Sequence, residues 1–480
     1  MAFNPEESIQ ALCHDFQTLI DFTSDPQQHT VRDVEAHLFS NLLKLGARLM
    51  QVFFESQAQR QSTAPLAQAD GPPLRYHGKR QRSYFSVFGK IHFERAYFYR
   101  PGGPGAVPLD HQLDLPDHCY SPLLCDWASF AATERSYGAS QALFEHLLQL
   151  RLPKLALERI VGEQAAQVEA FYAQKPPPKP AQEGTILVVQ ADGKGVPMRG
   201  PAHPSARRGK GDKRTKKKEA LVTALYSIDP YRRSPAQVTA ALMRQTGLEP
   251  PQARPSPQGK QVWATLSGKD TALAHLRRQA KRRAGEHVVD RVALTDGAIA
   301  LQQRMQTHFP DYTLVLDIIH AVEYLWKSAN ALKGERDPAR TAWVQAHLER
   351  LLSGQIAEVI TALEAEVADG ALEASARAVV ETTLGYYRRN APYMRYAVYL
   401  RRGWPIASGV VEGACGYLVK DRMEQSGMRW SQEGAQSVLD LRAVRVNGDW
   451  SAYQSYLHRQ AACEDETACS REQDELRLAA

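Results

Sequence analysis

The sequence lacks several features that mark common classes of protein. Its six cysteines form no CxxC pair, which argues against a zinc finger and favours free thiols in a reducing compartment. No apolar run approaches the roughly 18 residues that a membrane-spanning helix needs, so we expect no membrane partner. The first residues, MAFNPEESIQALCHDFQ, carry acids early and lack the layout of a secretion signal. These absences predict a cytoplasmic protein.

Acidic side chains are nearly absent from one basic segment. Between Arg199 and Lys218 the chain has nine lysines and arginines and one acid, Asp212, although the net charge of all 480 residues is only +6. The tail from Glu464 to Glu475 is biased the other way, with six acids and one arginine. A basic stretch inside a domain predicts a polyanionic partner, and a solvated loop is the alternative.

The composition, 43% hydrophobic and 23% charged, is typical of a globular chain of two to four domains. A capping pair at Thr30 and Asp33 opens an N-terminal helix, and the prolines of KPPPKPAQEG end a later helical region. The expected segments are 1–60 (helical), 61–115 (linker and small β-sheet), 116–174 (a helix-turn-helix that binds DNA, or a plain helical hairpin), 184–320 (first part of an α/β core), 321–400 (helical insertion), 401–460 (last part of the core) and 461–480 (acidic disordered tail).

The small β-sheet is expected from the aromatic, loosely alternating stretch 82–100, which is broken at Gly89. Its aromatic residues are interleaved with Lys90, His92, Arg95 and Arg100. This pattern indicates either the core of a small sheet with a polar outer face or a surface that contacts nucleic acid.

The core segment alternates apolar strand patterns with helical patterns. Strands are expected at 186–192, 218–228, 288–297 and 311–320, and helices at 269–283 and 298–308. Such alternation predicts an α/β sheet with parallel members. A helical pattern without strands then continues to about residue 399, and SGVVEGACGYLVKDRM predicts a last helix.

Two aspartates follow buried strands directly, and each precedes a glycine: Asp192 and Asp296. If the strands are neighbours, the two carboxylates lie side by side at one edge of the sheet. Glu412 lies near the start of a helix that is too apolar for a plain surface helix. Clustered carboxylates repel one another unless a cation neutralises them, and oxygen ligands suit Mg²⁺ or Mn²⁺. A single Asp-Gly after a strand is more often a turn.

The Asp192 strand, the LTDG strand of Asp296, the Asp317-x-x-His320 motif and the block SGVVEGACGYLVKDRMEQSGMRWSQEGAQSVLDLRA together resemble the DDE transposases of bacterial insertion sequences. The nearest resemblance is to the ISKra-type (ISKra four) group, which is related distantly to mutator-like elements. The resemblance covers about 84–442 and is most specific over 405–442. It implies an RNase H-like core with a helical insertion, and it assigns the three acids to Asp192, Asp296 and Glu412, which hold two Mg²⁺ or Mn²⁺ ions.

Asp317 also ends a strand pattern and competes with Asp296 as the second acid. In the RNase H-like arrangement the second acid ends a strand that precedes a helix and a further strand, which favours Asp296. Asp317 and His320 then match an accessory motif of mutator-like transposases. His320 is either a metal ligand or a residue that orients the site.

Further residues are expected to contact DNA. Lys420 lies eight residues after Glu412, close to two helical turns, and Arg422 and Arg429 are candidate phosphate contacts. Trp430 either stacks on an unpaired base or packs in the core. The basic segment supplies the rest of the expected contacts, which are sequence-independent: Lys210, Lys213, Arg214, Lys216, Lys217 and Lys218.

The resemblance implies an active transposase that binds terminal inverted repeats, cleaves the 3′ phosphodiesters and joins the freed ends to target DNA. It would act as a homo-oligomer on double-stranded DNA and associate with the bacterial nucleoid when bound. One alternative is a domesticated, transposase-derived DNA-binding protein without strand transfer. Another is an RNase H-like nuclease or resolvase, for which the helical insertion has no evident use.

Overall fold

The computed structural model describes residues 5–25, 29–68, 72–103, 105–200, 217–247, 252–368 and 372–460. The chain forms two compact units, residues 1–173 with 448–480, and residues 174–447. The expected acidic tail at 461–480 and most of the basic segment lie outside the described residues. Among the described residues, no helix is both long enough and apolar enough to cross a membrane.

The first unit begins with two long helices and continues with shorter ones. The capping box predicted at Thr30 and Asp33 is confirmed and starts the second helix. The helices of this unit are α1 (Pro5–Ser24), α2 (Val31–Gln59), α3 (Pro108–Gln112), α4 (Pro122–Glu134), α5 (Tyr137–Leu148), α6 (Lys154–Ala165) and α7 (Val168–Gln174, whose last residue belongs to the second unit).

A β-hairpin lies between α2 and α3 in the sequence, as the aromatic pattern predicted. Strands β1 (Arg75–Ser86) and β2 (Gly89–Tyr99) pair in antiparallel fashion. A small apolar core joins the hairpin to α2, where the rings of Phe54 and Phe93 stack with centroids 4.3 Å apart. Residues 450–460 return to this unit as a helix, and Tyr453 and Tyr456 contact Phe171 there.

The second unit is built on a mixed five-stranded sheet in the order β5-β4-β3-β6-β7. Strand β4 is antiparallel to both of its neighbours, and β3, β6 and β7 are parallel. The α/β class expected from the sequence is thus correct. The strands are β3 (Ile186–Pro197), β4 (Lys217–Ile228), β5 (Gln258–Thr265), β6 (Asp290–Thr295) and β7 (Thr313–Leu316).

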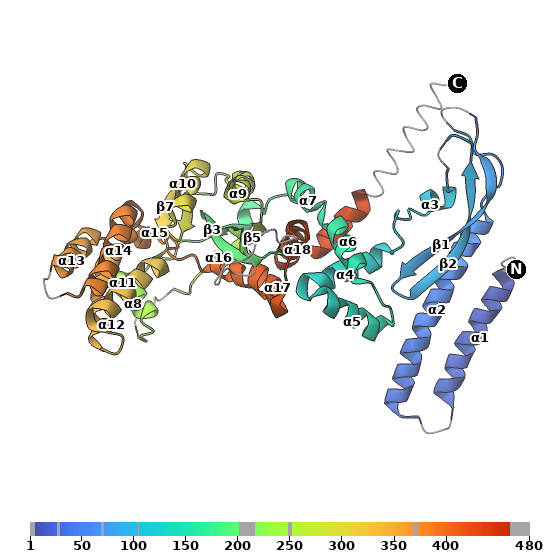
Figure 1. The fold of residues 1–480 in the computed structure, drawn as a ribbon, viewed down its shortest axis with the longest axis horizontal. Helices are drawn as coiled ribbons and strands as arrows, with labels where there is room; N and C mark the ends of the chain where they lie inside the picture. Colours follow the sequence, from blue (N-terminus) through green and yellow to red (C-terminus); the bar gives the residue numbers. More distant parts are fainter. Residues whose placement is uncertain are drawn as a thin grey trace, which may run out of the picture. The chain divides into compact units, whose positions relative to one another are not determined.

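Helices cover both faces of this sheet (Figure 1). One apolar core joins the side chains of Leu187 and Val189 to two helices, and another joins Ile186 and Val188 to the helices that follow β7. The first two are α9 (Lys269–Arg283) and α10 (Ile299–His308). The remaining helices are η1 (Pro180–Gln182), α8 (Pro235–Leu242), α11 (Ile318–Lys333), α12 (Ala339–Leu352), α13 (Ile356–Ala368), α14 (Ala374–Asn390), η2 (Ala391–Tyr393), α15 (Tyr396–Arg402), α16 (Gly409–Ala414), η3 (Cys415–Lys420), α17 (Asp421–Met423), η4 (Gln425–Gly427) and α18 (Gln432–Val446).

Two strand ends differ from the sequence prediction. β3 does not end at Asp192 but continues to Pro197, paired with β4. Gly193 suits this pairing because a Cβ there would lie 2.3 Å from the Glu219 carboxylate. β7 ends at Leu316 rather than at residue 320, because the Asp317 side chain accepts the backbone N–H of Ile319 and starts α11. The apolar run after Asp317 therefore belongs to a helix.

Candidate metal centre

Asp192 lies on β3, and Asp296 directly follows the neighbouring parallel strand, β6. The last paired residues of β3 and β6 are Gln190 and Leu294, and Asp192 and Asp296 each lie two residues beyond this pair. Both side chains are half-buried. The negative charge of Asp296 is one of the causes that raise the pKa of Asp192, so the two carboxylates interact.

The turn that carries Asp296 is held by the helical segment that follows β7. The Tyr386 hydroxyl on α14 donates a hydrogen bond to the backbone carbonyl of Asp296, at 2.9 Å. Gly297 has a φ of +85°, and a Cβ there would lie 2.7 Å from the same hydroxyl. The positive φ and this close approach both favour glycine at position 297. One side-chain oxygen of Asp296 also accepts the N–H of Ala298 at 2.9 Å. This contact is the turn that an Asp-Gly pair after a strand more often forms.

Glu412 is positioned by two contacts at the start of α16. The backbone N–H of Val411 donates to the Gln190 side chain on β3, at 3.0 Å. The Ser408 hydroxyl lies 2.9 Å from one carboxylate oxygen of Glu412. The short helix is therefore fixed to the sheet on the face that also carries Asp192, while the Glu412 carboxylate remains exposed.

Asp317 is fully buried, with 0% of its surface exposed. One of its oxygens accepts the N–H of Ile319 at 2.6 Å. The other accepts the N–H of Ser408 at 2.7 Å and also contacts the Ser408 hydroxyl. Asp317 thus joins the start of α11 to the segment before α16, and its hydrogen-bonding capacity is largely used by these contacts.

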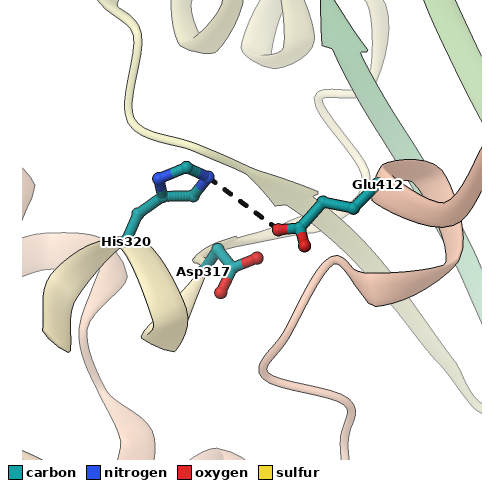
Figure 2. A group of neighbouring side chains, drawn as sticks. All are labelled: Asp317, His320 and Glu412. Atoms are coloured by element: carbon teal, nitrogen blue, oxygen red, sulfur yellow. Dashed lines mark ion pairs between the residues drawn. The ribbon is translucent and has the colours of Figure 1, made fainter. Parts of the chain in front are cut away.

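His320 lies in the first turn of α11, between two glutamates. Its Nε2 atom lies 3.9 Å from the nearer carboxylate oxygen of Glu412, and its Nδ1 atom lies 3.6 Å from Glu323. Figure 2 shows the imidazole and the Glu412 carboxylate pointing toward each other, with Asp317 beside them. Ligand atoms of Asp317, His320 and Glu412 all lie within 4.8 Å of one another, so this group could hold a metal ion.

The pKa of Asp192 is raised above the ordinary aspartate value. Burial is the main cause, and the charge of Asp296 acts in the same direction. The N–H of Gly193 and the thiol of Cys415 oppose the rise, since both donate to the carboxylate, at 2.6 Å and 3.4 Å. Burial and the neighbouring acid raise the pKa of the Cys415 thiol, which keeps the thiol protonated and able to donate.

A first prediction follows from the raised pKa of Asp192. Without metal, the ionised carboxylate is less favourable in the folded than in the unfolded chain, so it lowers stability at neutral pH. We expect Asp192→Asn to raise Tm by a few degrees in buffer with EDTA. The gain should disappear below the ordinary aspartate pKa, where wild-type Asp192 is protonated. Thermal unfolding followed by differential scanning fluorimetry would measure both effects, and a lower Tm at neutral pH would contradict the prediction.

The residues expected downstream of Glu412 have different environments. The eight-residue spacing to Lys420 assumed an uninterrupted α-helix, but Cys415–Lys420 is a π-helical turn, which changes the rotation between the two side chains. Lys420 and Arg429 are exposed. Arg422 is 0% exposed, and its guanidinium lies 4.7 Å from the ring centre of Trp430. In this conformation Arg422 does not reach a DNA backbone.

Trp430 packs in the core, the second of the two roles weighed for it. Its side chain is 6% exposed, and its indole N–H donates to the carbonyl of Met423 at 3.0 Å. Its backbone pairs with Pro197 and Arg199 beyond Asp192. The tryptophan therefore joins the end of β3 to the segment after α17.

Of the basic segment, the structure describes only Lys217 and Lys218 among the residues expected to contact DNA. Lys217 forms an ion pair of 2.6 Å with Glu424, and Lys218 donates to Gln432 at 2.5 Å. Both begin β4, where Lys217 is paired with Pro197. The other expected residues lie outside the described part of the chain: Lys210, Lys213, Arg214 and Lys216.

Four residues of the site were missed by the sequence reasoning: Gln190, Tyr386, Ser408 and Cys415. All four form hydrogen bonds with groups distant in the sequence, which no local pattern reveals. A weak signal existed for Gln190, a polar residue inside an otherwise apolar strand, since a buried amide needs a partner.

Comparisons with known proteins add little to this geometry. No protein-family model matches the chain, and no curated protein sequence matches it. Among solved structures, the chain is similar to the Drosophila P element transposase strand transfer complex, with a TM-score of 0.25 and 9% identity over 71% of this chain and 82% of that chain. At this TM-score the similarity assigns neither fold nor function.

Proposed function

We propose that the chain is the DNA transposase of a bacterial insertion sequence, of the ISKra type and distantly mutator-like. Its second unit would be an RNase H-like core. The observation that supports the proposal is the parallel pairing of β3 with β6, whose last pair, Gln190 and Leu294, lies two residues before Asp192 and Asp296. A helix that carries Glu412 lies against β3. The strand that ends before Asp296 precedes a helix and a further strand, as the resemblance implies.

The proposed acids would suit divalent cations. Asp192, Asp296 and Glu412 would hold two Mg²⁺ or Mn²⁺ ions, because these ions prefer carboxylate oxygens. Bound there, two ions would supply activation of a nucleophilic oxygen and stabilisation of the leaving oxygen. The raised pKa of Asp192 supports this assignment, because a cation would offset the burial and the repulsion by Asp296 that disfavour its charge.

The other residues would position these acids rather than bind metal. Asp317 is buried and engaged with Ser408 and Ile319, whereas Asp296 is half-buried and uses one oxygen in a local turn. His320 would orient Glu412, the carboxylate nearest to its Nε2 atom. We therefore keep Asp296 as the second acid.

The reaction would have two steps on double-stranded DNA. Water attacks the phosphodiester at each terminal inverted repeat, which breaks the bond to the 3′ oxygen and leaves a free 3′-hydroxyl. That hydroxyl then attacks a phosphodiester of the target, which forms a new bond and releases a target 3′-hydroxyl. Joining two ends at one target would need a homo-oligomer.

A strand-transfer assay tests this proposal. Purified protein is incubated with donor DNA that carries the ends of the element, a target plasmid, and Mg²⁺ or Mn²⁺. We expect metal-dependent cleavage at the ends and joined products on sequencing gels, and EDTA should abolish both. Cleavage without joining would instead support the nuclease alternative. Binding of the ends without cleavage would support a domesticated DNA-binding protein.

A further inference from the structure

The β1–β2 hairpin of the first unit carries an unbalanced positive charge. Residues 75–100 include seven lysines and arginines and one acid, Glu94. Arg82 and Arg95 share a single carboxylate, that of Asp110 on α3. Burial, and to a lesser extent the charges of Arg82 and Arg80, lower the pKa of Arg95 to about 10.

Next to these arginines, four side chains form a hairpin cluster: His77, Arg80, Tyr97 and Tyr99. The guanidinium of Arg80 lies 3.4 Å from the ring centre of Tyr97. The rings of Tyr97 and Tyr99 are nearly parallel, with centroids 6.3 Å apart. His77 meets both rings edge-on, at 6.2 Å and 5.7 Å.

The stacking holds Arg80 without using its hydrogen-bond donors. Its side chain is exposed, and within the described part of the chain no group accepts a hydrogen bond from it and no carboxylate pairs with it. A guanidinium held flat on a ring keeps its N–H groups in one plane, where two of them can bind a phosphate together. Arg75, also exposed and at the end of the same strand, adds a second cation.

Packing alone explains only part of this arrangement. Phe93 and Ile91 fill the small core, and the shared Asp110 partly neutralises Arg82 and Arg95. Neither the small core nor the Asp110 ion pairs require an exposed arginine that donates no hydrogen bond within the described residues. They also do not account for the excess of lysines and arginines in the hairpin. A polyanion would accept hydrogen bonds from Arg80 and would neutralise the excess positive charge.

We infer that the hairpin cluster and Arg75 form a binding site for the phosphate backbone of double-stranded DNA. A two-stranded β-ribbon is an element that the major groove admits, and phosphate contacts by arginine are independent of sequence. The choice of DNA as the polyanion rests on the proposed function. The site itself lies in the first unit and does not involve the metal centre.

The test is equilibrium binding in EDTA, followed by fluorescence anisotropy of a short labelled duplex of arbitrary sequence. We expect Arg80→Ala to weaken binding several-fold and to lower the slope of log affinity against log salt by about 1. Tyr97→Leu should weaken binding less, because it keeps the charge and removes the stack. Arg48→Ala is the matched control, since Arg48 is an exposed arginine of α2 that pairs with Asp15; it should bind as wild type does.

The outcomes separate this inference from the proposed function, because no cleavage is measured. Equal affinities for Arg80→Ala and Arg48→Ala would overturn the inference, provided that both variants keep the wild-type Tm. Tighter binding to a single-stranded RNA probe, also lost in Arg80→Ala, would overturn the assignment of double-stranded DNA. A protein that never cleaves DNA but binds it through Arg80 would support this site and count against the transposase proposal.

Discussion

Asp296→Ala is expected to abolish metal-dependent cleavage of the element ends, with a loss of about a thousandfold or more, as for other essential groups of an active site. Asp192→Ala and Glu412→Ala should do the same. The reason is physical: under the proposed function, each carboxylate would supply charge and oxygen ligands that water cannot replace in the same geometry. Single-turnover cleavage rates with Mn²⁺ would measure the loss.

The matched control is Asp311→Ala. Asp311 lies two residues before β7 and pairs with Arg277 and Arg291. It is therefore at the opposite end of this strand from Asp317. Losing these partly exposed ion pairs should change stability little and leave cleavage unaffected. An active Asp296→Ala together with an inactive Asp317→Asn would show that Asp317 is the second acid.

Asp317→Ala is expected to cause the largest loss of stability among these variants, on the order of 3 kcal/mol in the free energy of unfolding. The substitution leaves the N–H groups of Ile319 and Ser408 without their acceptor at a fully buried position. Urea denaturation followed by circular dichroism would measure it. A change below about 1 kcal/mol would contradict the buried role.

Asp317→Asn separates that structural role from metal binding. The amide keeps the shape and one acceptor, so the variant should fold and still show a rise in Tm when Mn²⁺ is added. In Asp296→Ala the same rise should be lost. We expect cleavage by Asp317→Asn to fall by about 10- to 100-fold, the range for a residue that orients a ligand, because Ser408 and with it Glu412 lose their anchor. Loss of the Mn²⁺-dependent rise in Asp317→Asn would instead make Asp317 a ligand.

Much of the second unit could be predicted from the sequence. The helix at 269–283 and the strand at 218–228 agree with α9 and β4, because their apolar periodicity is strong and their ends carry local signals. The pattern failed where apolar residues continue through a boundary. Ile318 and Ile319 were predicted to be part of a strand. They are helical, because the Asp317 side chain accepts the N–H of Ile319 and caps the start of α11.

Long-range packing also decided roles that local pattern left open. Arg422 was expected to contact phosphate and Trp430 either to stack on a base or to pack in the core, and the two side chains are buried against each other. The return of residues 448–460 to the first unit depends on partners far away in the sequence, among them the 3.1 Å hydrogen bond from Tyr172 to Asp449. No spacing within the chain indicates such a contact.

The sequence by itself indicated that Asp192 and Asp296 follow apolar strand runs and that Glu412 lies near the start of a helix, because apolar runs and Asp-Gly pairs are local features. The order of its strands favoured Asp296 over Asp317, but both aspartates follow apolar strand runs, and the sequence did not show how differently the two side chains are surrounded. Only the tertiary structure separates them: the segment around Ser408, ninety-one residues after Asp317, buries that carboxylate and supplies its donors. Asp296 is held through its backbone carbonyl by Tyr386, which leaves its side chain at the edge of the sheet beside Asp192. Burial depends on what packs from elsewhere in the chain, and that is a property of the fold.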